Sequence, residues 1–120
     1  PADGRWRVCS VVDRLEDAGL VVRAEDEPAR REFLAVEGRR YRVARGALEV
    51  YLYDDPQALA RDVAGMDTVR VTRQGAAPGG LTPPTFIRSA NLIALYEATS
   101  TAQAERVALA LGAGPPQPTP

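Results

Sequence analysis

Apolar and polar positions repeat along the chain with two different periods, which predict separate helices and strands. Apolar residues recur at helical spacing from Val8 to Leu15, from Leu59 to Met66 and from Ala104 to Leu111. Asp54, Asp55 and Pro56 are typical of the start of the second helix, and Ser100 with Gln103 forms a capping box ahead of the third. The first helix is expected to end at Gly19, with Leu20 folding back onto Leu15.

Shorter stretches with a period of two predict strands. Glu37-Gly38 and Arg45-Gly46 are expected to turn three of them into a meander, and Ser89-Ala90-Asn91 is expected to turn a later hairpin. Residues 25–28 and 74–84 read as loops. The predicted strands are Leu20–Arg23, Glu32–Val36, Arg40–Ala44, Ala47–Tyr53, Thr68–Arg73, Thr85–Arg88 and Leu92–Tyr96.

These elements predict an α+β fold, in which an antiparallel sheet of about six strands carries three helices on one face. The order strand, strand, strand, helix occurs from about residue 32 to 64 and again from about 68 to 111, which suggests an internal βββα duplication after the N-terminal helix. A chain of 120 residues is the usual size of one domain. We expect that domain over residues 1–113, followed by a disordered, proline-rich tail over residues 114–120.

Composition excludes several kinds of chemistry. All 15 basic residues are Arg, there is no His, and Cys9 is the single cysteine. Schiff-base lysines, phosphate-binding P-loops, histidine triads, His-ligated metal sites and internal disulfides are therefore ruled out. We expect no metal site and no cofactor, and Cys9 is expected to be a buried or half-buried side chain of the first helix.

One set of residues on the predicted sheet suggests a binding surface. Aromatic and guanidinium groups interleaved on an open sheet face are typical of proteins that bind single-stranded nucleic acid or peptides, because both groups stack. The same pattern is also typical of an exposed sheet kept soluble by cross-strand pairs, and Glu49 in its middle favours that interpretation. The candidate binding residues are Arg40, Arg42, Tyr51, Tyr53 and Arg70.

Charge is unevenly distributed although the net charge of the chain is only −1. Residues 28–46 hold six Arg and two Glu, a local charge of +4, and residues 13–27 hold six acids and two Arg, a local charge of −4. Such a dipole can steer a charged partner, but opposite patches more often neutralise one another across a fold. An all-Arg composition is also typical of a GC-rich bacterial genome, so the number of arginines alone indicates no function.

Two stretches resemble a known kind of domain: residues 50–55, and Phe86 followed by residues 91–96. They are similar to small uncharacterised bacterial domains of the secreted or lipoprotein type, which implies an extracytoplasmic setting and carries over no functional residues. The chain begins at Pro1, so a signal peptide or lipid anchor is expected upstream if that setting is correct. We therefore expect a non-catalytic extracytoplasmic domain that binds another protein or a small ligand. The alternatives are a nucleic-acid-binding module that uses the open sheet face and a small hydrolase that uses carboxylates only.

Overall fold

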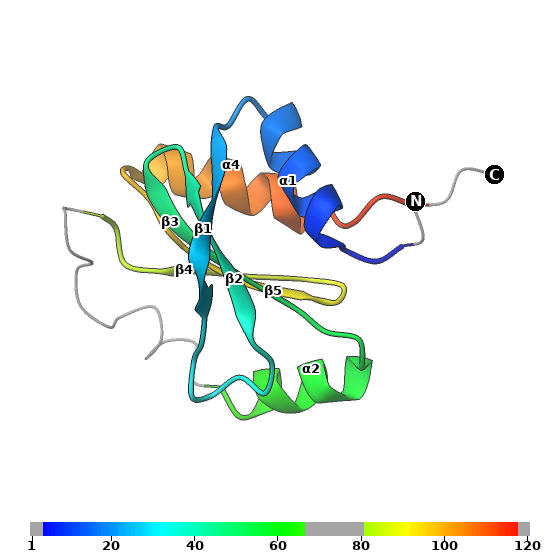
Figure 1. Cartoon of the computed structure of the whole chain (residues 1–120). Coiled ribbons are helices and arrows are strands. Elements are labelled where there is room, and N and C mark those ends of the chain that lie inside the picture. The colour runs from blue at the N-terminus through cyan, green and yellow to red at the C-terminus, as the bar shows by residue number, and fades with distance from the viewer. Residues whose placement is uncertain (1–3, 67–80, 118–120) are drawn as a thin grey trace.

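A computed structural model describes residues 4–66 and 81–117 of the chain. Within these residues the chain forms an α+β fold, as predicted (Figure 1). The three described helices and five described strands follow one another as α1 (Val8–Asp17), β1 (Val22–Ala29), β2 (Gly38–Val43), β3 (Gly46–Leu52), α2 (Pro56–Ala64), β4 (Thr85–Ser89), β5 (Leu92–Glu97) and α4 (Thr101–Gly112).

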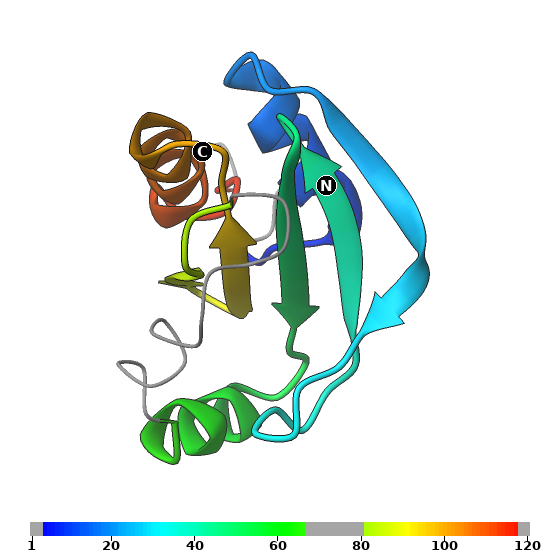
Figure 2. The ribbon, with the colours of Figure 1, turned by 90° about the vertical axis from the view of Figure 1, so that its left-hand side faces the viewer.

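The five strands form one antiparallel sheet in the order β1-β2-β3-β5-β4. β1 is an edge strand, and Figure 2 shows it bending along the right-hand side of the molecule. The bend coincides with a register shift between Ala24 and Pro28, where the three acidic residues 25–27 lie opposite a single residue of β2. A bulge, negative charge and a proline all discourage further strand pairing, so this edge is protected against association through its backbone.

The strand predictions are wrong around β1. Residues 25–28 were predicted as a loop but belong to β1, whereas residues 32–36 were predicted as a strand and form a turn closed by the bond from the Leu34 N–H to the Arg31 carbonyl (3.1 Å). The apolar side chains of Phe33, Leu34 and Val36 pack against the sheet instead of forming part of it. The sheet was expected to have about six strands, and the described residues form five. The predicted strand 68–73 lies outside the described residues.

Both faces of the sheet are covered, which corrects the prediction that all three helices pack on one face. Leu48 and Val50 of β3 belong to a core cluster with α1 and α4, whereas Tyr51 and Tyr53 belong to a second cluster with Leu59 of α2. Because successive side chains point to opposite sides of a strand, the two clusters lie on opposite faces. We call the side of α1 and α4 the first face and the side of α2 and residues 30–37 the second face (Figure 1).

The predicted internal duplication is unconfirmed. A two-fold axis between β3 and β5 would place α2 and α4, the helices that follow these strands, on the same face of the sheet. They lie on opposite faces. The second predicted unit also starts with residues 68–73, which lie outside the described part of the chain.

The first helix ends as predicted. Gly19 has a φ of +83°, its N–H donates to the Glu16 carbonyl (2.9 Å), and the Leu20 N–H donates to the Leu15 carbonyl (3.1 Å). This is a Schellman ending, which needs a residue in the left-handed region, where a Cβ costs about 1–2 kcal/mol. Leu15 and Leu20 are both buried, so the turn fixes the helix and the start of β1 on the first face.

Replacing Leu15 by Ala is expected to lower the free energy of unfolding by about 2–5 kcal/mol, because the side chain is fully buried and its removal leaves a cavity. Asp13→Ala, on the exposed side of the same helix, should cost less than about 0.5 kcal/mol. Arg14 is an unsuitable control, since it donates to the Ala110 carbonyl (2.8 Å) and lies 5.0 Å from the centre of the Trp6 ring. Denaturant unfolding measures these costs, and equal values for Leu15→Ala and Asp13→Ala would show that α1 is not docked.

The residues before α1 are held by the hairpin turn between β4 and β5. The Trp6 N–H donates to Asn91 Oδ1 (2.7 Å), and Asn91 Nδ2 donates back to the Trp6 carbonyl (3.0 Å). The indole Nε1 of Trp6 also donates to Ser89 Oγ (3.1 Å), and the ring is buried in the first-face core. The hairpin itself was predicted, with the turn at Ala90 and Asn91.

The start of the tail contacts the body of the domain. Pro115 is buried, and the carbonyl of Pro116 accepts a hydrogen bond from the Gly4 N–H (3.0 Å). The disorder predicted for the tail is therefore wrong for these two residues. Residues 118–120 lie outside the described part of the chain, so their predicted disorder stays a prediction.

Candidate binding surface

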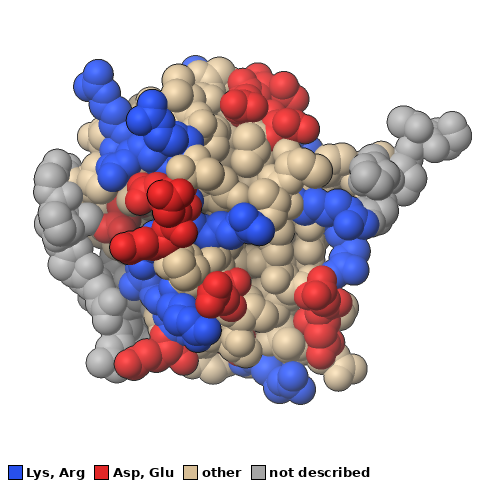
Figure 3. All heavy atoms as spheres, viewed as in Figure 1, with Lys and Arg blue, Asp and Glu red and all other residues tan. Residues whose placement is uncertain are grey.

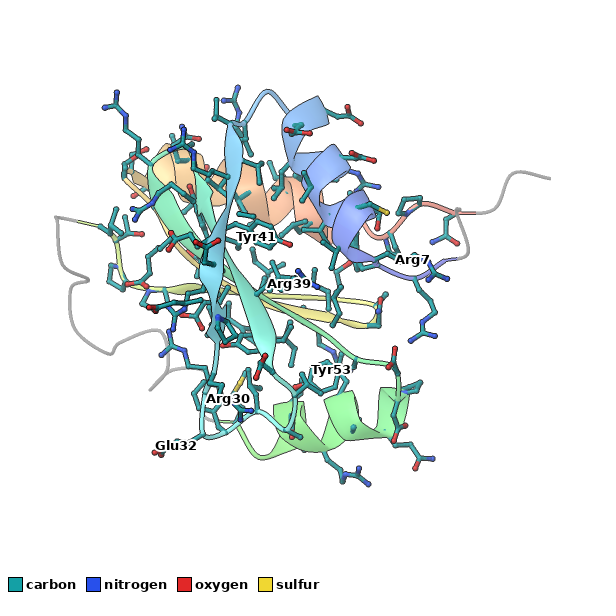
Figure 4. The ribbon with its side chains drawn as sticks, in the orientation of Figure 1. Arg7, Arg30, Glu32, Arg39, Tyr41 and Tyr53 are labelled. Atoms are coloured by element: carbon teal, nitrogen blue, oxygen red, sulfur yellow. The ribbon has the colours of Figure 1, made fainter. Side chains whose placement is uncertain are left out.

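The predicted Arg and Tyr surface does not exist as an open face. Tyr51 and Tyr53 lie on the second face with Arg40 and Arg42, as the strand register requires, but they are only 0% and 1% exposed. Residues 30–37 and α2 cover them, and Figure 4 shows Tyr53 between the sheet and α2. Arg70 lies outside the described residues. Stacking on these two tyrosines is therefore blocked.

Both tyrosine hydroxyls already have carboxylate partners. Tyr51 donates to Glu49 Oε1 (2.6 Å) and Tyr53 donates to Asp62 Oδ2 (2.5 Å). Burial, together with these carboxylates, raises the pKa of both tyrosines above its ordinary value. Asp62 also accepts the N–H of Ala35 (2.8 Å), so α2 is tied both to β3 and to the loop that covers it. These polar groups hold the second face together.

Glu49 is the most buried charged residue described. It is 7% exposed, and Arg31 donates to both of its oxygens, from Nε at 2.9 Å and from Nη2 at 2.7 Å. Burial alone would raise the pKa of Glu49, but the hydrogen bonds from Arg31 and Tyr51 outweigh burial and hold that pKa below its ordinary value. A carboxylate with all its partners in place anchors the loop at Arg31, and it is not poised for acid–base chemistry.

Arg40 and Arg42 differ in what they contact. Arg40 is half-buried, and its Nε donates to the Pro28 carbonyl (3.1 Å), beside the bulge of β1. Arg42 is exposed and lies 3.5 Å from Glu25 in a loose ion pair. Arg40 therefore helps to hold the edge strand β1 in place, whereas Arg42 can still contact another molecule.

Arg42 belongs to a hollow that the sequence did not predict. The hollow measures about 690 Å³ and lies where the turn between β2 and β3 meets the start of β1 and the start of α4. Figure 3 shows basic side chains gathered at the upper left, over this turn. We call it the arginine hollow; it is lined by Val21, Arg23, Arg42, Ala44, Arg45, Thr99 and Gln103.

The charges of the arginine hollow are of one sign. Three arginines line it and no carboxylate does. Within the described part of the chain, Arg42 has the loose pair with Glu25, while Arg23 and Arg45 have no ion pair or hydrogen bond. A second hollow of about 420 Å³ beside the β1 bulge is lined by four acidic residues and two arginines, so its lining is negative overall. The arginine hollow is therefore the described surface best suited to an anion.

Arg45 occupies a position that disfavours it. The strand pairs place Ala44 and Arg45 in a two-residue turn, with φ values of 48° and 69°. Turns of this kind favour Asn and Gly, because a residue with a Cβ is strained at positive φ. Strained residues that persist in a fold are often found at functional sites. Arg45 thus adds charge to the hollow at a cost in stability.

The turn was predicted one residue too late, at Arg45-Gly46. Gly46 is instead the first residue of β3, where a Cβ would lie 2.6 Å from the Glu97 carbonyl oxygen and 2.7 Å from the Tyr96 hydroxyl. The glycine is therefore needed for close packing against β5, and not for the turn. Arg45 is therefore the second residue of the turn, not the first as predicted, and it lines the arginine hollow.

Gln103 lines the arginine hollow and carries a buried side-chain oxygen. Its backbone N–H donates to Ser100 Oγ (3.2 Å), which confirms the Ser100 half of the predicted capping box and fixes Gln103 in the first turn of α4. The reciprocal bond from the Ser100 N–H to the Gln103 side chain is not formed. The side-chain Oε1 of Gln103 has no hydrogen-bond partner among the described residues. A buried polar atom without a partner costs about 1–3 kcal/mol, and because this oxygen is buried it is not open to a ligand in the hollow.

Other candidate chemistry is limited in the described residues. They contain no group of three or more acidic or Cys side chains placed to hold a metal ion. Cys9 is exposed, which corrects the expectation that it is buried or half-buried. Among the described helices, none is both long and apolar enough to span a bilayer.

The residues that the sequence missed are Arg23, Arg45 and Gln103. Arg23 and Arg42 are paired across β1 and β2, which becomes visible only once β1 is known to be an edge strand running from Val22 to Ala29. A signal for Arg45 was present, since Ala-Arg is an unusual sequence for a tight hairpin turn. Nothing in the sequence indicated that the start of α4 meets this turn.

Comparisons of the chain with protein-family models, with curated proteins and with solved structures give no match. The geometry and charge of the arginine hollow are therefore what indicates a function for this chain.

Proposed function

We propose that this chain is a non-catalytic binding domain that recognises an anionic group of a partner at the arginine hollow. The observation that carries the proposal is the convergence of Arg23, Arg42 and Arg45 on one hollow without a lining carboxylate. Guanidinium groups donate paired hydrogen bonds to carboxylate and phosphate oxygens, and like charges held close together are relieved by an anion. The volume of about 690 Å³ lies within the usual range of ligand sites.

Two further observations support a binding role over a catalytic one. The buried carboxylate Glu49 has its partners in Arg31 and Tyr51, and Asp62 has its partners in Tyr53 and Ala35. A hydrolase that used carboxylates would need one with spare hydrogen-bonding capacity near substrate. Binding of nucleic acid by the sheet is less well supported, because the two tyrosines on which bases would stack are both buried. An extracytoplasmic setting remains part of the proposal and is supported by the resemblance of residues 50–55 and 91–96.

Binding of inorganic phosphate to matched variants tests this proposal. The triple variant Arg23→Gln/Arg42→Gln/Arg45→Gln should bind phosphate at least about tenfold more weakly than the unmodified chain at constant ionic strength, because it loses the charge-assisted hydrogen bonds. The control triple variant Arg39→Gln/Arg61→Gln/Arg88→Gln replaces exposed arginines outside the hollow and changes the net charge equally. It should bind within about twofold of the unmodified chain. Calorimetry measures both affinities. If both triple variants lose the same affinity for phosphate, the effect is one of overall charge and the site is refuted.

Arg45→Gly is expected to have opposite effects on stability and binding. Glycine removes the strain at the positive φ of position 45, so the free energy of unfolding should rise by about 0.5–1 kcal/mol. Loss of the guanidinium should weaken phosphate binding about threefold or more. Thermal unfolding and calorimetry on the same sample check both. A variant that is less stable, or that binds phosphate as tightly as the unmodified chain, would contradict the role given to Arg45.

A further inference from the structure

The bulge of β1 places Glu25 beside Arg42, at the border of the arginine hollow. Arg23 pairs with Arg42 across the two strands. An unbroken ladder would put Glu25, two residues further along, opposite Arg40. The register shift interrupts the ladder there, and Arg40 donates to the Pro28 carbonyl instead. The Glu25 carboxylate therefore lies against Arg42, with 3.5 Å between Glu25 Oε1 and Arg42 Nε.

Glu25 offsets a repulsion that the strand register builds into the arginine hollow. Arg23 and Arg42 lie directly opposite each other, and like charges in that position destabilise a sheet. Arg45 adds a third positive charge from the turn. In the part of the chain that the structure describes, Glu25 is the one carboxylate that forms an ion pair with these arginines. Glu25 itself lines the second hollow, beside the β1 bulge, so it reaches Arg42 from outside the arginine hollow.

The ion pair of Glu25 and Arg42 is weak enough for an incoming anion to displace. Its separation of 3.5 Å exceeds the length of about 2.7–2.9 Å that is usual for a charge-assisted hydrogen bond. The side chains of Arg42 and Glu25 are also 53% and 38% exposed. Exposed pairs of this kind change an equilibrium by up to about fivefold, which is about 1 kcal/mol. An anion that contacts several arginines at once forms stronger bonds than Glu25 forms with one.

We infer that Glu25 is a built-in competitor of the anion that binds at the arginine hollow. Its carboxylate occupies Arg42 while the hollow is empty and is displaced when an anion binds to the three arginines. The inference rests on the proposed function and adds a regulation of the same site, because removal of the Glu25 charge raises the affinity for anions. A ligand must also make contacts beyond Arg42 in order to replace Glu25.

Inorganic phosphate tests the inference with the full chain and two matched variants. Glu25→Gln should bind phosphate about twofold to fivefold more tightly than the unmodified chain at constant pH and ionic strength, because Arg42 then has no carboxylate to lose. Glu27→Gln changes the net charge equally and lies in the same bulge, but Glu27 has no ion pair within the described residues. It should bind within about 1.5-fold of the unmodified chain. NMR titration of ¹⁵N-labelled protein measures the three affinities, and equal gains in both variants would overturn the inference.

A double-mutant cycle separates the contact with Arg42 from other effects of Glu25. When Arg42→Gln is already present, adding Glu25→Gln should change the phosphate affinity by less than about 1.5-fold, because the carboxylate has no guanidinium to occupy. If Glu25→Gln tightens phosphate binding as much without Arg42 as with it, the inference is wrong. If phosphate binds at the arginines and Glu25→Gln has no effect, only this inference fails. If phosphate binds neither the unmodified chain nor Glu25→Gln, the proposed function fails with it.

Discussion

Arg31→Ala is expected to lower the free energy of unfolding by about 3 kcal/mol, the low end of the cost of stranding a buried charge, because Arg31 is itself about a quarter exposed. The substitution leaves Glu49 at 7% exposure without the guanidinium that contacts both of its oxygens. It also releases the loop that covers Tyr51 and Tyr53. Urea unfolding of the purified variant measures the cost.

The neighbouring ion pair provides a matched control for this prediction. Arg30 lies 3.1 Å from Glu37, but both side chains are largely exposed, at 78% and 51%. Arg30→Ala should therefore cost less than about 1 kcal/mol. Replacing the whole buried group, with Arg31→Met, Glu49→Leu and Tyr51→Phe together, should restore much of the lost stability, because no charge is then left without a partner. If Arg31→Ala costs no more than Arg30→Ala, Glu49 is solvated and the second face is not closed.

Alkaline pH is expected to unfold the domain in one step that ionises its tyrosines. All four tyrosines are buried, and burial raises the pKa of each of them; Glu49 and Asp62 add to the effect at Tyr51 and Tyr53. A pKa that is higher in the folded than in the unfolded chain contributes stability below the unfolded value of about 10, and this stability is lost as the pH rises above that value. For each tyrosine that stays neutral in the folded chain, the free energy of unfolding should fall by about 1.4 kcal/mol per pH unit above pH 10.

Absorbance of tyrosinate at 295 nm and circular dichroism, followed together from pH 9 upward, check this expectation. The two signals should change at the same pH, and the chain unfolded in urea should titrate smoothly with a midpoint near 10. Tyrosinate that forms with that midpoint while the dichroism stays native would mean that water reaches the tyrosines, and that the second face is open as first predicted from the sequence.

Local signals in the sequence were read correctly where one residue determines the outcome. The left-handed Gly19, the Asp55 cap before Pro56 and the Ser100 cap of α4 all depend on residues within a single turn of helix. The period of two that predicted the strand Ala47–Tyr53 also holds, since Leu48 and Val50 lie on one face of β3 and Tyr51 and Tyr53 on the other. It did not reveal that the tyrosine face would be covered.

The errors arose where packing between distant segments decides the structure. Residues 32–36 have the apolar pattern of a strand, but they serve as a cover for the second face, held there by the contact of Arg31 with Glu49. The arginine hollow depends on three separate parts of the chain, β1, the turn after β2 and the start of α4. Arg45 was expected in that turn, but as its first residue instead of its second.

The side-chain Nε–Hε signals of the arginines offer the most direct measurement of anion binding at the hollow. Inorganic phosphate is titrated into ¹⁵N-labelled chain while sodium chloride is lowered to keep the ionic strength constant. The signals of Arg23, Arg42 and Arg45 should shift together along one saturating curve, because the three groups line the same hollow. Signals of Arg30, Arg39 and Arg88, which lie outside it, should stay in place. Shifts spread evenly over all these arginines, or no saturation at the three of the hollow, would contradict an anion site there.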